Sequence, residues 1–337
     1  MPKTAGDLWG DIVSWDNLVA AYMNARRGKR FKPDIMRFHL NWEEELLNIH
    51  NHLIWGSWQP KPFSAFPVYE PKERLIEAPH FSDRIVHHAM HRVLEPYFER
   101  RFIHHSYACR RGKGTHAACA AVQKLIRRAQ KRWGRVYVLQ GDIRKYFPSI
   151  VPDILLRLVR RVIRDERVVD LWERIVRCCG PTQVGLPVGV LTSQLGANVY
   201  LDPFDHYVTD DLGYGLYVRY MDDWVILGPS KQELWKLLGH LEEWLQDNLC
   251  LRLSKYGVYP AAQGVDFAGY RTWSTHILPR KRNTKRARRR IKRLARLCAL
   301  RCDKQEALRA VKASFWGYTK FCSGATTWKK VDEETLG

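Results

Sequence analysis

Two adjacent carboxylates, Asp222 and Asp223, lie in a Tyr-Met-Asp-Asp segment, residues 220–223, between two short apolar runs. Apolar runs on both sides of a tight polar turn predict a β-hairpin that carries the two acids at its tip. Because Asp is a common turn residue, a purely structural turn is one interpretation of the pair. A third acid, Asp142, follows the apolar run 136–139 and is expected at the end of a buried strand.

Three carboxylates brought together would form an anionic oxygen cluster, which suits Mg²⁺ because hard cations select oxygen ligands. Two such ions about 3.5–4 Å apart can activate a 3′-hydroxyl and stabilise a departing pyrophosphate. The rest of the chain has the opposite charge, since 56 Lys and Arg against 35 Asp and Glu give a formal net charge of +21. A polyanionic partner is expected. The acids therefore predict nucleotidyl transfer, with two Mg²⁺ ions, for which Mn²⁺ could substitute, held by Asp142, Asp222 and Asp223.

The composition excludes several other classes of protein. With 45% hydrophobic residues the chain can bury a large core. The longest uncharged run, 178–201, is interrupted by prolines and polar residues, so no membrane segment is expected and the predicted location is the cytoplasm. The eight cysteines are scattered, which does not fit a disulfide scaffold. Cys298 and Cys302 lack partners at zinc-site spacing, so core packing is their default interpretation.

The periodicity of apolar residues predicts an α+β fold, with helices on one face of an antiparallel sheet. Prolines between residues 60 and 71 predict a loop or an edge strand there. An apolar stripe beneath a cationic face predicts a separate helical unit from residue 281, after a linker near 274–280. The other predicted helices cover residues 15–23, 35–53, 82–98, 115–131, 152–177, 194–211 and 231–247.

Three segments resemble, in order, the successive palm motifs of reverse transcriptases: GDIRKYFPSI at 141–150, GLPVGVLTSQ at 185–194 and YMDD at 220–223. The resemblance extends from about residue 69 to 273 and implies a right-hand polymerase with fingers, palm and a short helical thumb. The implied domains are N-terminal helices and fingers over 1–135, with part of the fingers within 150–185, the palm over 136–273, a basic thumb over 280–325 and a tail over 326–337.

The resemblance also implies roles for individual residues. The backbone carbonyl of Ile143 would join the three acids at the metal ions, and Phe147 would exclude a ribose 2′-hydroxyl, which points to DNA as the product. The alternatives are that Phe147 is a core side chain and that each cation is a solvated surface group. The other implied nucleotide contacts are Lys72 and Arg74 at the triphosphate, Val188, Gly189 and Gln194 in the second palm segment, and Lys255 as a proton donor to pyrophosphate.

Two basic segments, residues 106–115 and 280–302, are expected to bind the template and primer backbone. Residues 280–302 contain twelve Lys or Arg and no acid, a composition suited to phosphate contacts. The segment 265–270 resembles the hairpin that grips the primer end in polymerases. The candidate nucleic-acid contacts are Arg110, Arg111 and Lys113 in the first basic segment, and Arg286, Arg289, Lys292, Arg293 and Arg296 in the second.

The second palm segment also suggests a subclass. Many reverse transcriptases read Gln-Gly-x-x-x-Ser-Pro where this chain has Val188 to Gln194. This substituted form, together with residues 83–88 and 106–110, resembles the reverse transcriptases of diversity-generating retroelements in phages and bacteria, which copy a template RNA with frequent errors at adenine. Losing an amide at Val188 should relax the geometry that penalises mispairs.

That subclass implies mutagenised cDNA made from template RNA, a primer and dNTPs. It also implies a small basic accessory protein that forms an oligomeric helical bundle. A retron or group II intron-type reverse transcriptase is an alternative, although these 337 residues show no Cys/His-rich endonuclease or ribonuclease H segment. A non-catalytic RNA-binding protein with a polymerase fold is a further alternative, disfavoured because unneutralised carboxylates would repel RNA.

Overall fold

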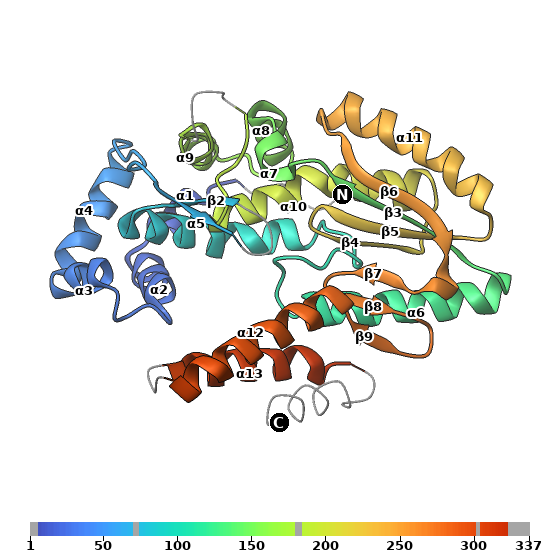
Figure 1. Cartoon of the computed structure of the whole chain (residues 1–337). Coiled ribbons are helices and arrows are strands. Elements are labelled where there is room, and N and C mark those ends of the chain that lie inside the picture. The colour runs from blue at the N-terminus through green and yellow to red at the C-terminus, as the bar shows by residue number, and fades with distance from the viewer. Residues whose placement is uncertain (1–5, 70–73, 179–183, 301–303, 323–337) are drawn as a thin grey trace. The chain divides into compact units, whose positions relative to one another are not determined.

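The computed structural model describes residues 6–69, 74–178, 184–300 and 304–322, and the chain forms two compact α+β units (Figure 1). The first unit combines Met1–His104, Ile143–Gly213 and Leu241–Ser254, and the second combines His105–Asp142, Tyr214–His240 and Lys255–Gly337. Each unit therefore joins segments that are far apart in the sequence. The predicted α+β class is confirmed.

The first unit is mainly helical. Its helices α5 and α10 lie against each other, and the imidazole Nδ1 of His87 is 2.8 Å from the Thr192 hydroxyl across this contact. Burial, with the nearby charges of His88 and Arg84, lowers the pKa of His87 to about 3, so the ring is neutral there. The elements of this unit are α1 Trp9–Val13, α2 Trp15–Arg26, α3 Pro33–Leu40, α4 Trp42–Ile54, β1 Ser64–Val68, β2 Arg74–Ala78, α5 Phe81–Glu99, α7 Tyr146–Ser149, α8 Pro152–Arg160, α9 Glu166–Arg177, α10 Leu191–His206 and a π-helical turn Tyr207–Asp211.

Two predicted helices of this unit are each two helices in the structure. The helix expected over 35–53 is broken at Asn41, whose backbone leaves the helical region (φ −128°, ψ 39°) between α3 and α4. The helix expected over 152–177 is broken before Asp165, which caps α9 and accepts hydrogen bonds from the backbone of Leu8 and Trp9. At Asp165 a helix cap overrode a continuous apolar periodicity. The proline-rich segment forms β1, which pairs antiparallel with β2 as an extended hairpin.

The second unit is built on a four-stranded sheet of order β4-β5-β3-β6 and a three-stranded sheet of order β7-β8-β9. Strand β5 pairs antiparallel with both β3 and β4. The elements of this unit are α6 Thr115–Trp133, β3 Tyr137–Ile143, β4 Tyr217–Tyr220, β5 Asp223–Gly228, β6 Leu253–Pro260, a 3₁₀ turn Ala261–Gln263, β7 Val265–Phe267, β8 Tyr270–Thr272, β9 Ile277–Pro279, α12 Lys281–Leu300 and α13 Gln305–Lys320, with the beginning of α11 Lys231–Leu249.

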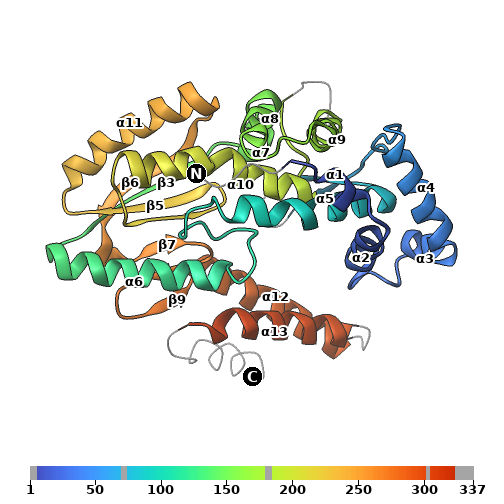
Figure 2. The same cartoon turned by 180° about the vertical axis from the view of Figure 1, so that it is seen from behind.

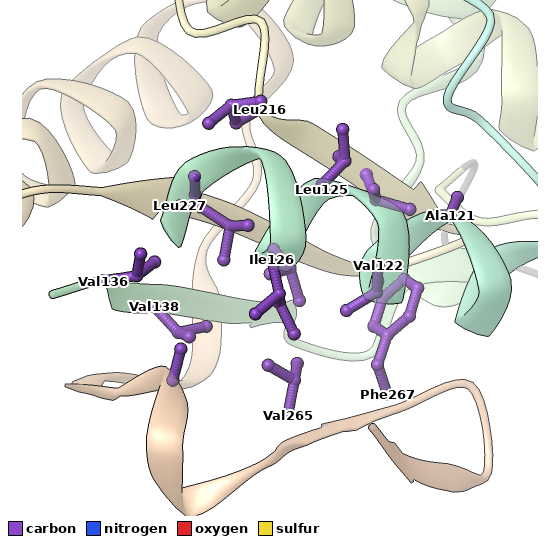
Figure 3. Packing of buried hydrophobic residues seen from close by; sticks show 14 of the residues in the cluster. Ala121, Val122, Leu125, Ile126, Val136, Val138, Leu216, Leu227, Val265 and Phe267 are labelled. Atoms are coloured by element: carbon purple, nitrogen blue, oxygen red, sulfur yellow. The ribbon is translucent and has the colours of Figure 1, made fainter. Parts of the chain in front are cut away.

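The core of the second unit lies between α6 and the two sheets (Figure 3). Residues spaced three or four apart on α6 face the sheet, as an amphipathic helix requires. On the strands, Val138 and Leu227 point toward the same side because they are directly opposed in the antiparallel register. The structure adds a helix to the other face, where Leu234 of α11 lies over Gly228. The labelled residues of this core are Ala121, Val122, Leu125, Ile126, Val136, Val138, Leu216, Leu227, Val265 and Phe267.

The predicted linker before the basic helices is wrong, because residues 277–279 form β9 and pair with β8. Helices α12 and α13 lie side by side as a hairpin (Figure 2), with Ile291 of α12 packed on Phe315 of α13. This hairpin is tied to the strands, since the Tyr318 backbone carbonyl accepts a hydrogen bond from the Tyr270 hydroxyl. The basic helices therefore share the second unit with the sheet.

A membrane-spanning helix would need a long and strongly apolar stretch. Within the ranges that the structure describes, no helix has the length and apolar character to cross a membrane.

Candidate active site

Asp142 and Asp223 lie directly opposite each other in the β3–β5 ladder. Directly opposed residues of an antiparallel pair point to the same face of the sheet and stand about 5 Å apart at their Cα atoms. The same face continues along β3 and β5 as the apolar core, so the two carboxylates end a buried layer. The register thus brings together two of the three acids that the sequence singled out.

Asp222 lies in the two-residue turn that joins β4 to β5. Tyr220 and Asp223 are opposed across this turn, and Met221 has a positive φ of 57°, a conformation unusual for a side chain of this kind. The carbonyl of Met221 accepts a hydrogen bond (3.1 Å) from the guanidinium of Arg219, which is fully buried. Residues in sparsely populated backbone conformations cluster at functional sites.

The carboxylate of Asp223 has specific partners that sequence reasoning missed. Gln140 donates from Nε2 to Asp223 Oδ1 (2.9 Å), and the Tyr259 hydroxyl donates to Gln140 Oε1 (2.7 Å). Gln140 precedes Asp142 by two residues, so strand alternation places both on one face. A polar residue at that position in an apolar strand was the signal available in the sequence.

Burial is the main cause that raises the pKa of Asp223 to about 7, and the neighbouring Asp142 and Asp222 carboxylates raise it further against the opposing effects of Gln140 and Arg280. Negative charge is therefore concentrated in a poorly solvated place. An oxygen-only donor set of this charge fits a hard divalent cation. Among the described residues no three acidic, His or Cys side chains already form a group that could hold a metal ion.

The candidate nucleotide-binding residues lie in the first unit. Phe147 is half-buried in α7, and its carbonyl accepts the backbone N–H of Leu186 (2.8 Å). Gly185 has φ +107°, and an added Cβ would be 3.2 Å from the Pro148 backbone. The second palm segment is therefore clamped onto the turn that carries Phe147, and only glycine suits that position.

Val188 and Gly189 form a turn before α10, and Gln194 lies in the first turn of that helix. Gly189 has φ +105°, and its Cβ position is 3.4 Å from the Ile76 side chain on β2. This contact brings the β1–β2 hairpin and the second palm segment together. Arg74 begins β2, but the structure describes only its backbone. Lys72 lies outside the described residues.

Residues 61–272 match the family model described as "Reverse transcriptase (RNA-dependent DNA polymerase)", which covers more than half of the chain. The chain belongs to the reverse transcriptase family. The matched residues are an RNA-directed DNA polymerase domain. The reaction of this family implies template RNA, a primer, deoxynucleoside triphosphates and a divalent metal.

Curated relatives place this reverse transcriptase near bacterial and intron-encoded proteins. It is 31% identical over 203 residues to Protein YkfC of Escherichia coli (57% of this chain, 49% of that protein). It is 26% identical over 176 residues to the group II intron-encoded protein LtrA of Lactococcus lactis (49% of this chain, 28% of that protein). The chain thus spans about half the length of YkfC and less of LtrA.

A solved structure supports the fold. The apo telomerase of Candida tropicalis superposes with a TM-score of 0.54 over 74% of this chain and 55% of that chain, at 9% identity. At such low identity the likeness speaks for the polymerase fold alone. It is consistent with the α+β arrangement of this reverse transcriptase.

The remaining candidate cations of the reverse transcriptase are in the second unit. Arg110 donates to the Ser106 carbonyl (2.7 Å), and Lys113 lies over the Tyr107 ring (5.2 Å). This loop is fixed to β4, because the Tyr107 backbone N–H donates to the Arg219 carbonyl (3.0 Å). Arg111 is exposed in the same loop, and Lys255 is exposed on β6, the strand next to β3.

Helix α12 presents a cationic face. All five of its predicted nucleic-acid contacts are exposed, whereas Ile291 on the other side is fully buried against α13. A hollow of about 430 Å³ lies along this face, lined by Arg289, Lys292, Arg293, Arg296 and Leu297. Such a row of flexible cations suits a phosphate backbone rather than a small ligand.

Reversing two of these charges, Arg289→Glu with Arg293→Glu, should weaken primer–template binding about tenfold or more at moderate salt. It should also lower the slope of log affinity against log salt by about 2, because each lost phosphate contact removes roughly 0.9. Fluorescence anisotropy over a salt series measures both. The matched control is Lys231→Glu with Lys236→Glu on the exposed face of α11. An unchanged slope, or an equal change in the control, would show that this face does not contact the phosphate backbone.

The raised pKa of Asp223 predicts a pH-dependent stability in the absence of metal. Between pH about 4 and 7 the Asp223 carboxyl binds a proton in the folded chain but not in the unfolded one, so its contribution to stability should fall as pH rises through this window. Asp223→Asn removes the charge and should stabilise the metal-free protein above pH 7 by about 1–4 kcal/mol, with little gain near pH 4. Thermal unfolding at pH 5 and pH 8 tests this, and equal shifts at both values would contradict it.

Proposed function

We propose that this chain is an RNA-templated DNA polymerase that transfers nucleotides by two-metal catalysis at Asp142, Asp222 and Asp223. The observation that carries the proposal is the direct opposition of Asp142 and Asp223, with Asp222 on the adjoining turn. The carbonyl of Ile143, next along β3, would complete the ligand set. Bound Mg²⁺, or Mn²⁺ in its place, would neutralise charge at the 3′-hydroxyl and the leaving pyrophosphate.

In this proposal the chain's own residues bind and select the nucleotide. Phe147 would exclude a 2′-hydroxyl from a turn held rigid by Gly185 and Leu186. Lys72 and Arg74 would bind the triphosphate, and Lys255 would supply a proton to pyrophosphate. Val188, Gly189 and Gln194 would contact the incoming base pair, as parts of fingers and palm, and the cationic face of α12 would act as the thumb.

Primer extension tests the polymerase assignment. A primer annealed to RNA should be extended with dNTPs in Mg²⁺, and rNTPs should be used far less well because of Phe147. Chelation with EDTA should stop the reaction, and excess Mg²⁺ should restore it. RNA binding without any metal-dependent extension would support the non-catalytic alternative.

Within the family, the relatives favour a YkfC-like or group II intron-type enzyme, because YkfC and LtrA are the kinds of protein that this chain resembles in sequence. The Val188 to Gln194 segment is the specific observation that favours the second candidate, an error-prone enzyme of a bacterial or phage diversity-generating retroelement. That candidate would work in the cytoplasm with a small basic accessory protein, which would form an oligomeric helical bundle.

Fidelity separates the two candidates. Single-nucleotide kinetics should be measured opposite adenine and opposite the other three template bases. Frequent misincorporation confined to template adenine favours the retroelement enzyme, whereas similar ratios for all four bases favour the intron-type enzyme. The same kinetics with a purified basic helical-bundle protein would show whether such a partner changes the rate.

A further inference from the structure

The amide of Gln140 lies at the centre of a hydrogen-bonded network around Asp223. Its Nε2 atom donates to Asp223 Oδ1 (2.9 Å) and to the backbone carbonyl of Asp266 (2.9 Å). Its Oε1 atom accepts from the Tyr259 hydroxyl (2.7 Å). The amide therefore joins a candidate catalytic carboxylate to β6 and β7, two strands that come much later in the chain.

The orientation of this amide follows from the chemistry of its partners. A backbone carbonyl can only accept a hydrogen bond, so the side of the amide facing Asp266 must be the NH₂ group. The oxygen then faces Tyr259, whose hydroxyl must donate. Asp223 consequently meets an N–H donor that is held in place by two other groups, rather than an amide free to turn over.

The second acceptor in the network is itself anchored. The Asp266 carbonyl also accepts from Arg280 Nη2 (3.2 Å), and the Arg280 guanidinium forms an ion pair with the Asp266 carboxylate. Asp266 is paired with Arg271 across the β7–β8 hairpin. The donor that meets Asp223 is thus fixed by a strand, a hairpin and the residue that precedes α12.

We propose that Gln140 is a positioning residue that holds the Asp223 carboxylate in one rotamer, through Oδ1, so that its remaining lone pairs are preorganised for a divalent cation. This inference rests on the proposed function. Groups that orient a metal ligand through a hydrogen bond commonly change metal affinity 10- to 100-fold when they are removed. Tyr259 acts one step further out, by fixing the amide.

Metal binding to the metal-free full-length chain tests this directly. Mn²⁺ is titrated into the chain without nucleic acid, and free Mn²⁺ is followed by electron paramagnetic resonance. The Mn²⁺ binding that disappears in Asp222→Ala/Asp223→Ala defines the site. Gln140→Met, which keeps the length but removes the donor, should weaken this Mn²⁺ binding about tenfold. The Mg²⁺ concentration for half-maximal extension should rise similarly, and kcat at saturating Mg²⁺ should change less.

Gln123→Met is the matched control. Gln123 also donates its amide to a distant backbone carbonyl, that of Trp273 (3.1 Å), and lies on α6 in the same unit. A general loss of packing or of a hydrogen bond would affect both variants. We expect Gln123→Met to leave the Mn²⁺ affinity within twofold of wild type.

Tyr259→Phe provides the second arm and decides the question if Gln140→Met does not fold. Alone it should weaken Mn²⁺ binding about two- to fivefold, because the amide loses one of its two anchors. In the Gln140→Met background it should have no further effect, since both residues act through one amide. Additive effects, or an unchanged Mn²⁺ affinity in both single variants, would overturn the inference.

Failure of the proposed function would look different. If the wild-type chain extends no primer but Gln140→Met still weakens Mn²⁺ binding, the polymerase assignment fails and the positioning role stands. If the wild-type chain extends primers and Gln140→Met changes neither Mn²⁺ affinity nor the Mg²⁺ requirement, the positioning role is wrong.

Discussion

Changing Asp222 and Asp223 to alanine is expected to reduce metal-dependent DNA synthesis on an RNA template by roughly 1,000-fold or more. The expected loss exceeds that from removing a single electrostatic stabiliser, because two of the three candidate metal ligands disappear together. RNA affinity should stay within about twofold of wild type, since the cationic face of α12 is unchanged. Steady-state primer extension and anisotropy with labelled RNA measure the two quantities.

An adjacent acidic pair elsewhere gives a matched control for this variant. Asp210 and Asp211 are exposed at the π-helical turn after α10, and their double alanine variant makes the same change in charge. It should retain most of the activity. Circular dichroism establishes that both variants fold. Extension by the Asp222→Ala/Asp223→Ala variant above a few per cent of wild type would remove the pair from the metal site.

Gly141→Ala should destabilise the second unit by about 3 kcal/mol, the upper end of the usual cost of overpacking. Gly141 is directly opposed to Trp224 in the β3–β5 ladder, and an added Cβ would clash with Cζ2 of the indole. The indole cannot move aside, because Trp224 is fully buried. Chemical denaturation followed by tryptophan fluorescence measures the loss.

At a second glycine, substitution by alanine should raise the free energy of unfolding instead of lowering it. Gly239 lies inside α11 with nothing within 4 Å of its Cβ position, so Gly239→Ala should be stabilising by about 0.5–1 kcal/mol.

Trp224→Leu should recover part of the Gly141→Ala loss, because it opens space at the clash. If Gly141→Ala is no less stable than wild type, β3 and β5 do not pair in this register.

Local chemistry in the sequence was enough to predict several features of this protein. The hairpin around Asp222 and Asp223, the buried strand before Asp142 and the cationic face of α12 all follow from short-range patterns. Apolar alternation, helical periodicity and charge are properties of neighbouring residues, so they can be read without knowing the fold. The same patterns, through the three palm segments, also indicated the polymerase family.

Two of the errors arose where a partner outside the segment decided a local feature. Asp165, which caps α9 after the interruption, also accepts hydrogen bonds from the backbone of Leu8 and Trp9, and β9 pairs with β8. Leu8 and Trp9 are far from Asp165 in the sequence, whereas β8 ends only a few residues before β9 begins. Periodicity alone therefore continued a helix too far and left residues 277–279 as a linker.

The arrangement of the site itself was decided by tertiary structure. Residue types marked Asp142 and Asp223 as candidates, but only the β3–β5 register places them opposite each other. The same register sets Gly141 against Trp224, and the packing of β6 and β7 brings Tyr259 and Asp266 to Gln140. A one-residue slip would turn every one of these side chains to the other face. Pairing between distant strands depends on the whole core, which is why the sequence could name the acids but not their geometry.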